Sequence, residues 1–266
     1  MQNLDKNVVK KMYGDIANLT VHPGQDHACC VPSEIDTVEF SVMAEKYEGI
    51  DGYAPEADFG LGCGIPTQYA NIRKGESVLD LGSGAGNDCF IASKLVGDTG
   101  KVIGIDMTED MVRRANENKA KLNINNVDFV YGEIEDMPIE DAIVDVVISN
   151  CVLNLVPDKN KAFAELYRVL KSGGRFTVSD IVLTAELPEN IRKAAVMYAG
   201  CVSGAIHVDE YLGIIAQNGF KDVKIVKEKD IHLPDGLLKK YLSDEEIIKF
   251  RENGAVLKSV TVYAEK

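Results

Sequence analysis

The chain has 266 residues, of which 45% are hydrophobic and 27% are charged, and its formal net charge at pH 7 is −13. It is long enough for one large domain with a cap, and its composition is that of a globular protein. The negative charge would repel a phosphate backbone, and no apolar run approaches the ~18 residues that a membrane span requires, so we expect neither nucleic acid nor a membrane as a partner. The first residues lack the apolar core of a signal peptide, which indicates a cytoplasmic protein.

Residues 1–70 show no strand pattern and contain clusters of glycine and proline, so we expect them to form a cap or lid. Two adjacent cysteines, Cys29 and Cys30, lie in this segment. A zinc site that combines them with His22 and His27 is an alternative, but the spacing of these residues is not one that structural zinc sites use.

From residue 71 to residue 183, short β-rich runs alternate with amphipathic runs. This alternation predicts a parallel sheet with helices on both faces, which is a Rossmann-like α/β fold. Thr108 and Asp158 have positions typical of helix N-caps, and Gly173 and Gly174 are expected to end the last helix of this region. The strands are expected at 77–82, 101–106, 127–132, 143–150 and 175–183, and the helices at 87–97, 108–122 and 158–171.

The last third of the chain, 184–266, interrupts this rhythm with a run at 186–206 that is rich in small residues and contains Cys201. We expect this run to be helical and the strand and helix pattern to resume after it. The remaining elements are expected to be a helix at 207–220, a strand at 222–229, a polar helical insert at 235–253 and a terminal strand at 257–266. The sequence thus indicates a cap (1–70), a core (71–183) and a closing segment with a helical insert (184–266).

The stretch "LDLGSGAGND" places Gly82, Gly84 and Gly86 between an expected strand and an expected helix. Glycine allows a sharp turn and a close approach to a ligand, and the helix N-terminus adds a positive dipole. The spacing is G-x-G-x-G, so the G-x-G-x-x-G pattern of NAD sites is not met. Asp106 follows Gly86 by 20 residues at the end of the next strand, where a carboxylate can accept both hydroxyls of a ribose.

This pattern resembles that of the class I S-adenosylmethionine-dependent methyltransferases. The resemblance implies a seven-stranded, mostly parallel sheet that ends in an antiparallel hairpin. It also implies a donor site in which the strand acid and the glycine loop hold the methionine moiety, Asp106 holds the ribose, and the residue after it packs on the adenine. Two further residues line the adenine edge, and an asparagine lies beside the methyl group. The implied donor site consists of Asp80, Gly82, Ser83, Gly84, Gly86, Asp106, Met107, Ile134, Glu135 and Asn150.

Cys151 follows Asn150 directly, and this position excludes two classes of methyltransferase. The stretch "SNCV" has no proline, whereas enzymes that methylate amino groups of DNA carry a diproline motif here. Enzymes that methylate cytosine need a Pro-Cys nucleophile, and the sequence contains no Pro-Cys dipeptide.

Three separate segments would bring Cys63, Cys151 and Cys201 to one face of the sheet. Thiolates are soft donors, and three of them suit a pyramidal trivalent centre such as As(III). The lone pair of As(III) is itself a nucleophile, so its methylation would need no general base. A single cysteine is more often a buried apolar residue than a ligand, and we assign Cys89 to that class.

Beyond the glycine loop, the chain resembles the arsenite S-adenosylmethionine methyltransferases. The resemblance runs through "ADFGLGCG" (57–64), "VLDLGSGAGNDCF" (78–90), "ISNCVLNLVPDK" (148–159) and "GCVSGA" (200–205). It implies that Cys63, Cys151 and Cys201 bind As(III), and that Cys29 or Cys30 takes part in a disulfide exchange during turnover.

The implied activity is methyl transfer from S-adenosylmethionine to arsenite and to methylated trivalent arsenicals. A thiol reductant is then required, and thioredoxin or small thiols are the expected partners. We also expect the chain to end with the closing strand, without the further C-terminal domain of longer members. Two alternatives stay open: a methyltransferase that acts on an organic small molecule, and a noncatalytic thiol protein that sequesters metalloid.

Overall fold

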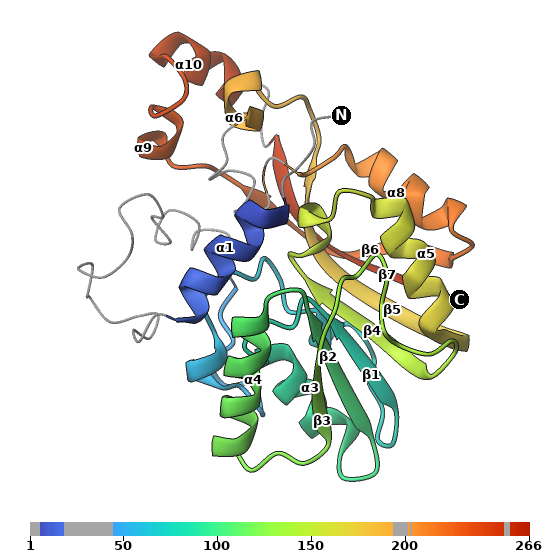
Figure 1. Cartoon of the computed structure of the whole chain (residues 1–266). Coiled ribbons are helices and arrows are strands. Elements are labelled where there is room, and N and C mark those ends of the chain that lie inside the picture. Colours follow the sequence, from blue (N-terminus) through green and yellow to red (C-terminus); the bar gives the residue numbers. More distant parts are fainter. Residues whose placement is uncertain (1–5, 19–44, 194–201, 203, 253–255) are drawn as a thin grey trace.

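The computed structural model describes residues 6–18, 45–193, 202, 204–252 and 256–266. These residues form one sheet of seven strands in the order β3-β2-β1-β4-β5-β7-β6 (Figure 1). The first five strands run parallel, and β7 pairs antiparallel with both β5 and β6. The expected fold class and the antiparallel closing hairpin are confirmed. The strands are β1 (Ser77–Leu81), β2 (Lys101–Asp106), β3 (Val127–Tyr131), β4 (Val144–Asn150), β5 (Leu170–Leu183), β6 (Lys221–Ile231) and β7 (Leu257–Glu265).

Helices cover both faces of the sheet because successive residues of the buried strands point to opposite sides (Figure 1). Val78 of β1 belongs to a buried cluster with Phe90 of α3, whereas Leu79 packs in another cluster with Phe163 of α5. The N-terminal helix packs on α4 through a smaller cluster that includes Met12. The covering helices are α1 (Lys6–Ala17), α3 (Asn87–Val96), α4 (Glu109–Lys121), α5 (Lys159–Val169) and α8 (Val208–Gln217).

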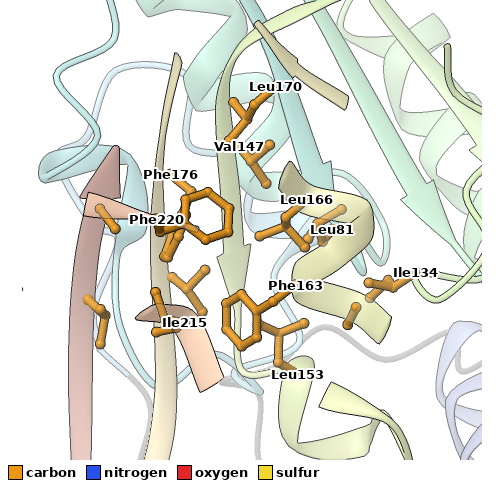
Figure 2. Close-up of a cluster of buried hydrophobic side chains, with 14 of the residues drawn as sticks. Leu81, Ile134, Val147, Leu153, Phe163, Leu166, Leu170, Phe176, Ile215 and Phe220 are labelled. Carbon is orange, nitrogen blue, oxygen red and sulfur yellow. The ribbon is translucent and has the colours of Figure 1, made fainter. Parts of the chain in front are cut away.

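The largest core lies between the sheet and the pair α5 and α8. Figure 2 shows Leu81, Val147 and Phe176 of the strands with Phe163 of α5 and Phe220, which follows α8. The rings of Phe176 and Phe220 meet edge to face with centroids 4.8 Å apart. Each such side chain contributes about 1.5–3 kcal/mol on burial, so this core fixes the sheet on which the site is built.

A second core lies beyond the carboxyl ends of β5 and of β4, where the chain adds three short helices. These helices are α6 (Glu189–Lys193), α9 (Asp235–Leu238) and α10 (Asp244–Glu252), and Figure 1 shows them gathered at one end of the molecule. Ile191, Leu238 and Phe250 of these helices pack in one buried cluster that also contains Cys63 and Cys151. The closing segment therefore supplies part of the wall around two of the predicted arsenic ligands.

The expected elements differ from the structure at four places. Gly173 and Gly174 lie inside β5 and do not end α5, which stops at Val169 because Leu170 takes extended dihedral angles and pairs with β4. The glycines fall at an irregularity of the β4–β5 register, which absorbs extra residues of β5. Of the expected helix at 186–206, the structure describes α6, whereas 194–201 and 203 lie outside the described residues. The insert at 235–253 divides into α9 and α10, and α1 was not expected.

The two predicted N-caps behave differently. Asp158 caps α5, because its carboxylate accepts the amide of Lys161 at 3.0 Å. Thr108 stands at the N-cap position of α4, but its amide donates instead to Asp106 at 2.8 Å. Short 3₁₀ turns complete the fold at Pro55–Ala57, Pro66–Gln68 and Leu153–Leu155. Among the described helices, none is long and apolar enough to cross a membrane.

One buried ion pair connects the sheet to the segment that precedes it. Arg175 of β5 donates to the carboxylate of Glu76 at 2.8 and 3.0 Å and to the carbonyls of Ala70, at 2.7 Å, and Asn71. Although burial alone would raise the pKa of Glu76, the hydrogen bonds from Arg175 and from the Arg73 amide lower it. The division into cap, core and closing segment at residues 70 and 183 stays a prediction, since β6 and β7 of the closing segment belong to the same sheet as the core.

The sheet ends on one side at β6, which is an edge strand. Most of its residues are exposed or half-buried, and four lysines are distributed along it. Lys224 lies over the ring of Tyr263 at 4.8 Å from its centroid, and Lys227 pairs with Glu45 at 2.5 Å. The open edge of the sheet is thus strongly charged.

Candidate active site

A cleft opens at the carboxyl ends of β1, β2 and β4. This is where ligands bind in open parallel sheets, because the loops that follow the strands meet there. All the predicted donor-site residues except Gly86 line the cleft, and Cys151 lines it as well. Gly86 is at the N-cap of α3 with φ of 99°, where a Cβ would lie 2.7 Å from the ring of Phe129, so it shapes the turn.

The carboxylate of Asp106 is held between the glycine loop and the start of α4. It accepts the amide of Gly84 at 3.0 Å and the amide of Thr108 at 2.8 Å. Burial raises the pKa of Asp106, and these two amides act in the opposite direction by stabilising the charged form. The side chain is thus fixed at the position where a carboxylate is expected to accept ribose hydroxyls.

The cleft is strongly acidic. Among the described residues that line it, Lys6 is the one lysine or arginine. Burial raises the pKa of Asp80 well above its usual range, and the neighbouring Asp88 adds to this effect. A buried carboxylate without a counter-charge is costly, so this environment favours a ligand that carries positive charge. The acidic residues along the cleft are Asp58, Asp80, Asp88, Asp106, Glu133 and Glu135.

Helix α1 forms one wall of the cleft. Lys6 pairs with Glu133 at 2.8 Å and also with Glu135, and Lys10 pairs with Glu133 at 3.2 Å. Glu135 in turn accepts the amide of Asp158 at 3.2 Å. The helix was missed in the sequence, although the buried positions 9, 12 and 16 follow the spacing of an amphipathic helix.

Asn150, the last residue of β4, holds the loop that carries Cys63. Its side-chain oxygen accepts the amides of Cys63, at 3.1 Å, and Gly64, at 3.3 Å, and its nitrogen donates to the Gly64 carbonyl at 2.8 Å. Ser259 of β7 donates to the Cys63 carbonyl at 2.6 Å. The Asn150 side chain thus connects the Cys63 loop to the position directly before Cys151. Cys63 and Cys151 are two of the predicted arsenic ligands.

Close contacts with Asn150 and Ser179 explain the glycines on either side of Cys63. A Cβ at Gly62 would lie 2.5 Å from the amide nitrogen of Asn150, and a Cβ at Gly64 would lie 2.4 Å from the hydroxyl of Ser179. Both distances are shorter than real contacts allow. Only glycine therefore permits the loop to reach the end of the sheet.

Cys151 has an unusual backbone conformation. Its φ is 59°, in the left-handed region that non-glycine residues rarely adopt, and its amide donates to the Ser179 carbonyl at 2.7 Å. Such conformations cost about 1–3 kcal/mol and are concentrated at functional sites. The thiol follows β4 directly and lines the cleft.

Cys63 is fully buried and Cys151 is 5% exposed, and both belong to the second core. Val202, the residue after Cys201, is fully buried in the same cluster. Cys201 itself lies outside the described residues, as do Cys29, Cys30, His22 and His27. The described cysteines are all free thiols.

Cys89 is fully buried in α3, which confirms its assignment to the core. Its thiol donates to the carboxylate of Asp80 at 3.2 Å. Burial raises the pKa of Cys89 well above its usual range, and the charge of Asp80 adds to the shift. Cys89 therefore stays protonated and is a poor ligand, in contrast to what a thiolate site requires.

We expect Gly62→Ala to displace the Cys63 loop and to weaken binding of trivalent arsenicals by about tenfold or more, because the added methyl group would collide with Asn150. Gly213→Ala is the matched control. Gly213 lies inside α8 with open space around it, so the same change should stabilise the helix by about 0.5–1 kcal/mol and leave binding unchanged. Equal arsenical affinity for the two variants, measured by calorimetry, would contradict this account of the loop.

Comparison with known proteins identifies the family. Residues 72–219 match the model of a methyltransferase domain family. An arsenite methyltransferase from Halobacterium salinarum is 41% identical over 241 residues, which are 91% of this chain and 59% of that protein. The crystal structure of an arsenic(III) S-adenosylmethionine methyltransferase from Chlamydomonas reinhardtii matches with a TM-score of 0.66 and 31% identity, over 89% of this chain and 75% of that one. The chain belongs to the arsenite methyltransferase family.

The chain spans 51% to 64% of the length of five curated arsenite methyltransferases that it matches. A ubiquinone/menaquinone biosynthesis C-methyltransferase from Escherichia coli is 30% identical over 197 residues, which are 74% of this chain and 75% of that protein. The sequence identity to these arsenite methyltransferases is therefore higher than that to the C-methyltransferase. The methyltransferase fold itself is shared with enzymes named for organic substrates.

Proposed function

We propose that the protein transfers the methyl group of S-adenosylmethionine to trivalent arsenic held by Cys63, Cys151 and Cys201. The observation that carries this proposal is the position of Asn150, the last residue of β4. Asn150 lines the cleft, precedes Cys151 and accepts a hydrogen bond from the Cys63 amide. Cys151 lines the cleft, and the Cys63 backbone is bonded to the residue before it, which supports a shared role for the two thiols. The similarity to arsenite methyltransferases supports the same substrate.

The donor fits the cleft by charge and by shape. S-adenosylmethionine carries a sulfonium and an ammonium group, and the acidic lining of the cleft suits both. Asp106 would accept the ribose hydroxyls, Met107 and Ile134 would contact the adenine, and the loop from Gly82 to Gly86 would approach the methionine moiety. When bound, the donor supplies an electrophilic methyl group.

The thiolates would hold As(III) with its lone pair directed toward the cleft. The lone pair forms the new As–C bond, so no side chain has to remove a proton from the nucleophile. The chain's contribution is then position: Asn150 fixes the Cys63 loop, and the left-handed turn fixes Cys151. Orientation of two reactants can supply about 7–11 kcal/mol in well-aligned systems.

Methyl transfer uses the lone pair and raises arsenic from the trivalent to the pentavalent state. Two electrons must return for trivalent arsenic to be regenerated, and two thiolates supply them when they join in a disulfide. Turnover therefore needs an external thiol reductant, and thioredoxin or small thiols have this chemistry. Cys29 or Cys30 is proposed to take part in the exchange, and a reducing compartment such as the cytoplasm suits the requirement for free thiols.

An assay of arsenic products tests the proposal. Incubation with S-adenosylmethionine, arsenite and a thiol reductant should yield methylated arsenic in parallel with S-adenosylhomocysteine. Binding of arsenite without methylation would instead favour a sequestering protein. The likeness to an E. coli C-methyltransferase motivates the second candidate, an organic substrate, and methyl transfer to organic thiols or quinols but not to arsenite would favour it.

Asp106→Ala should weaken binding of S-adenosylhomocysteine by about 1.5–3 kcal/mol, because it removes the charged acceptor predicted for the ribose hydroxyls. Asp110→Ala is the control, since Asp110 lies in the first turn of α4 with its side chain 43% exposed and pairs with Arg113 at 3.1 Å. Arsenite binding without donor should be the same in both variants. Unchanged affinity for S-adenosylhomocysteine in Asp106→Ala, measured by calorimetry, would refute the ribose assignment.

A further inference from the structure

Asp88, in the first turn of α3, has a buried carboxylate of which one oxygen accepts hydrogen bonds. The side chain lines the cleft and is 8% exposed. Its Oδ2 accepts the hydroxyl of Tyr47 at 2.9 Å and the amide nitrogen of Asn150 at 3.2 Å. Its Oδ1 is buried and has no hydrogen-bond partner among the described residues.

Among the described residues, Asp88 has the acidic neighbours Asp80 and Asp58. Asp80 lies close enough for the charge of Asp88 to affect its ionisation, and burial raises the pKa of Asp88 to about 6. Lys6, the one basic side chain along the described lining, is engaged by Glu133 at 2.8 Å and by Glu135. A buried carboxylate that has a free oxygen and no counter-charge among the described residues suits a cationic donor, which a ligand in this cleft can supply.

The hydrogen bonds of Asp88 continue to the Cys63 loop. The Tyr47 hydroxyl oxygen accepts a hydrogen bond from Asn150 Nδ2 at 2.7 Å. The same oxygen lies 3.1 Å from the carbonyl oxygen of Gly64. Asn150 contacts Asp88 through its nitrogen and the Cys63 amide through its oxygen. An ordered Asp88 therefore fixes the amide group of Asn150, which in turn holds the backbone of Cys63 and Gly64.

We propose that Asp88 binds the ammonium group of the donor's methionine moiety and that Tyr47 and Asn150 connect this contact to the Cys63 loop. The proposal rests on the proposed function, because the ammonium belongs to S-adenosylmethionine. Asp88 is a binding residue, whereas Tyr47 and Asn150 are positioning residues. Since a loop that is already ordered loses less entropy on binding, occupancy of the ammonium site should raise the affinity for trivalent arsenic.

The ammonium contact is tested with S-adenosylhomocysteine and its deamino analogue, in which hydrogen replaces the ammonium group. The native protein should bind the parent compound about tenfold or more tightly than the analogue. In Asp88→Asn this ratio should fall close to one, because the isosteric amide lacks the charge. The ratio compares two ligands of one variant, so a general loss of stability does not alter it.

Asp110→Asn is the control for a lost charge. Asp110 is not among the residues that line the cleft and pairs with Arg113 at 3.1 Å. This variant should keep the native ratio. An unchanged ratio in Asp88→Asn, or an equal loss in Asp110→Asn, would overturn the assignment while leaving donor binding intact. Failure of the native protein to bind S-adenosylhomocysteine would instead overturn the proposed function.

The connection to the loop is tested with phenylarsine oxide as the trivalent probe. Saturating S-adenosylhomocysteine should raise its affinity by roughly fivefold in the native protein, and the deamino analogue should give little increase. Tyr47→Phe should remove most of the increase and keep most of the ammonium discrimination, since the carboxylate itself is retained. Equal increases with both ligands, or an undiminished increase in Tyr47→Phe, would overturn the connection.

Discussion

Replacement of Cys151 by serine should reduce arsenite methylation by at least about a hundredfold. Serine is nearly isosteric, but its hydroxyl is a hard donor that binds As(III) poorly, so the arsenic would lose its fixed place at the end of β4. The backbone should tolerate the change, because the hydrogen bond from the Cys151 amide to Ser179 does not involve the side chain. The measurement is the rate of methylated arsenic formation at saturating S-adenosylmethionine.

Cys89→Ser is the matched control for this loss. Cys89 is equally buried, and a serine hydroxyl there can still donate to Asp80. Methylation should persist in this variant, and both variants should bind S-adenosylhomocysteine. Cys63→Ser and Cys201→Ser should resemble Cys151→Ser. A native rate of arsenite methylation in Cys151→Ser would remove the thiol from the mechanism.

The second large effect concerns the stability of the fold. Arg175→Met should lower the free energy of unfolding by about 3–5 kcal/mol, because it leaves the carboxylate of Glu76 unpaired in a site where the two side chains are only 9% and 15% exposed. The carbonyls of Ala70 and Asn71 would lose their donor as well. Urea denaturation followed by circular dichroism measures the change.

An exposed pair provides the comparison. Arg113 bonds to Asp110 and Glu117 on the surface of α4, where its side chain is 49% exposed. Arg113→Met should leave the denaturation midpoint nearly unchanged, since solvent screens such pairs. If the two variants were equally stable, the buried pair would not hold the segment before β1 as inferred.

The sheet could be predicted because its strands carry a local signal. Apolar runs such as 77–82 and 101–106 are bounded by turn residues, and the glycine loop between β1 and α3 identifies the ligand end of the sheet. Asp106 could be placed for the same reason, since it ends a strand adjacent to that loop. The places of the glycine loop and Asp106 thus follow from the order of strands and the chemistry of strand ends, whereas the other residues of the predicted donor site are implied by the resemblance to methyltransferases.

Other features depend on contacts between distant segments, and the sequence carries little sign of them. The hydrogen bond of Tyr47 to Asp88 spans 41 positions, and that of Cys63 to Asn150 spans 87. The left-handed conformation of Cys151 accompanies a hydrogen bond to the distant Ser179, and no local sequence pattern indicates it. The error at Gly173 and Gly174 has a similar origin, since pairing of Leu170 with Val144 overrides a local glycine signal.

The charged edge strand β6 has a consequence for behaviour at high concentration. An open strand edge offers unpaired amides and carbonyls to any other chain and is a common start of aggregation. In this sheet, Lys221, Lys224 and Lys229 would have to be desolvated before a second strand could pair there. These lysines therefore disfavour pairing at the edge of β6, and variants that replace them by valine should precipitate at lower concentrations than the native protein.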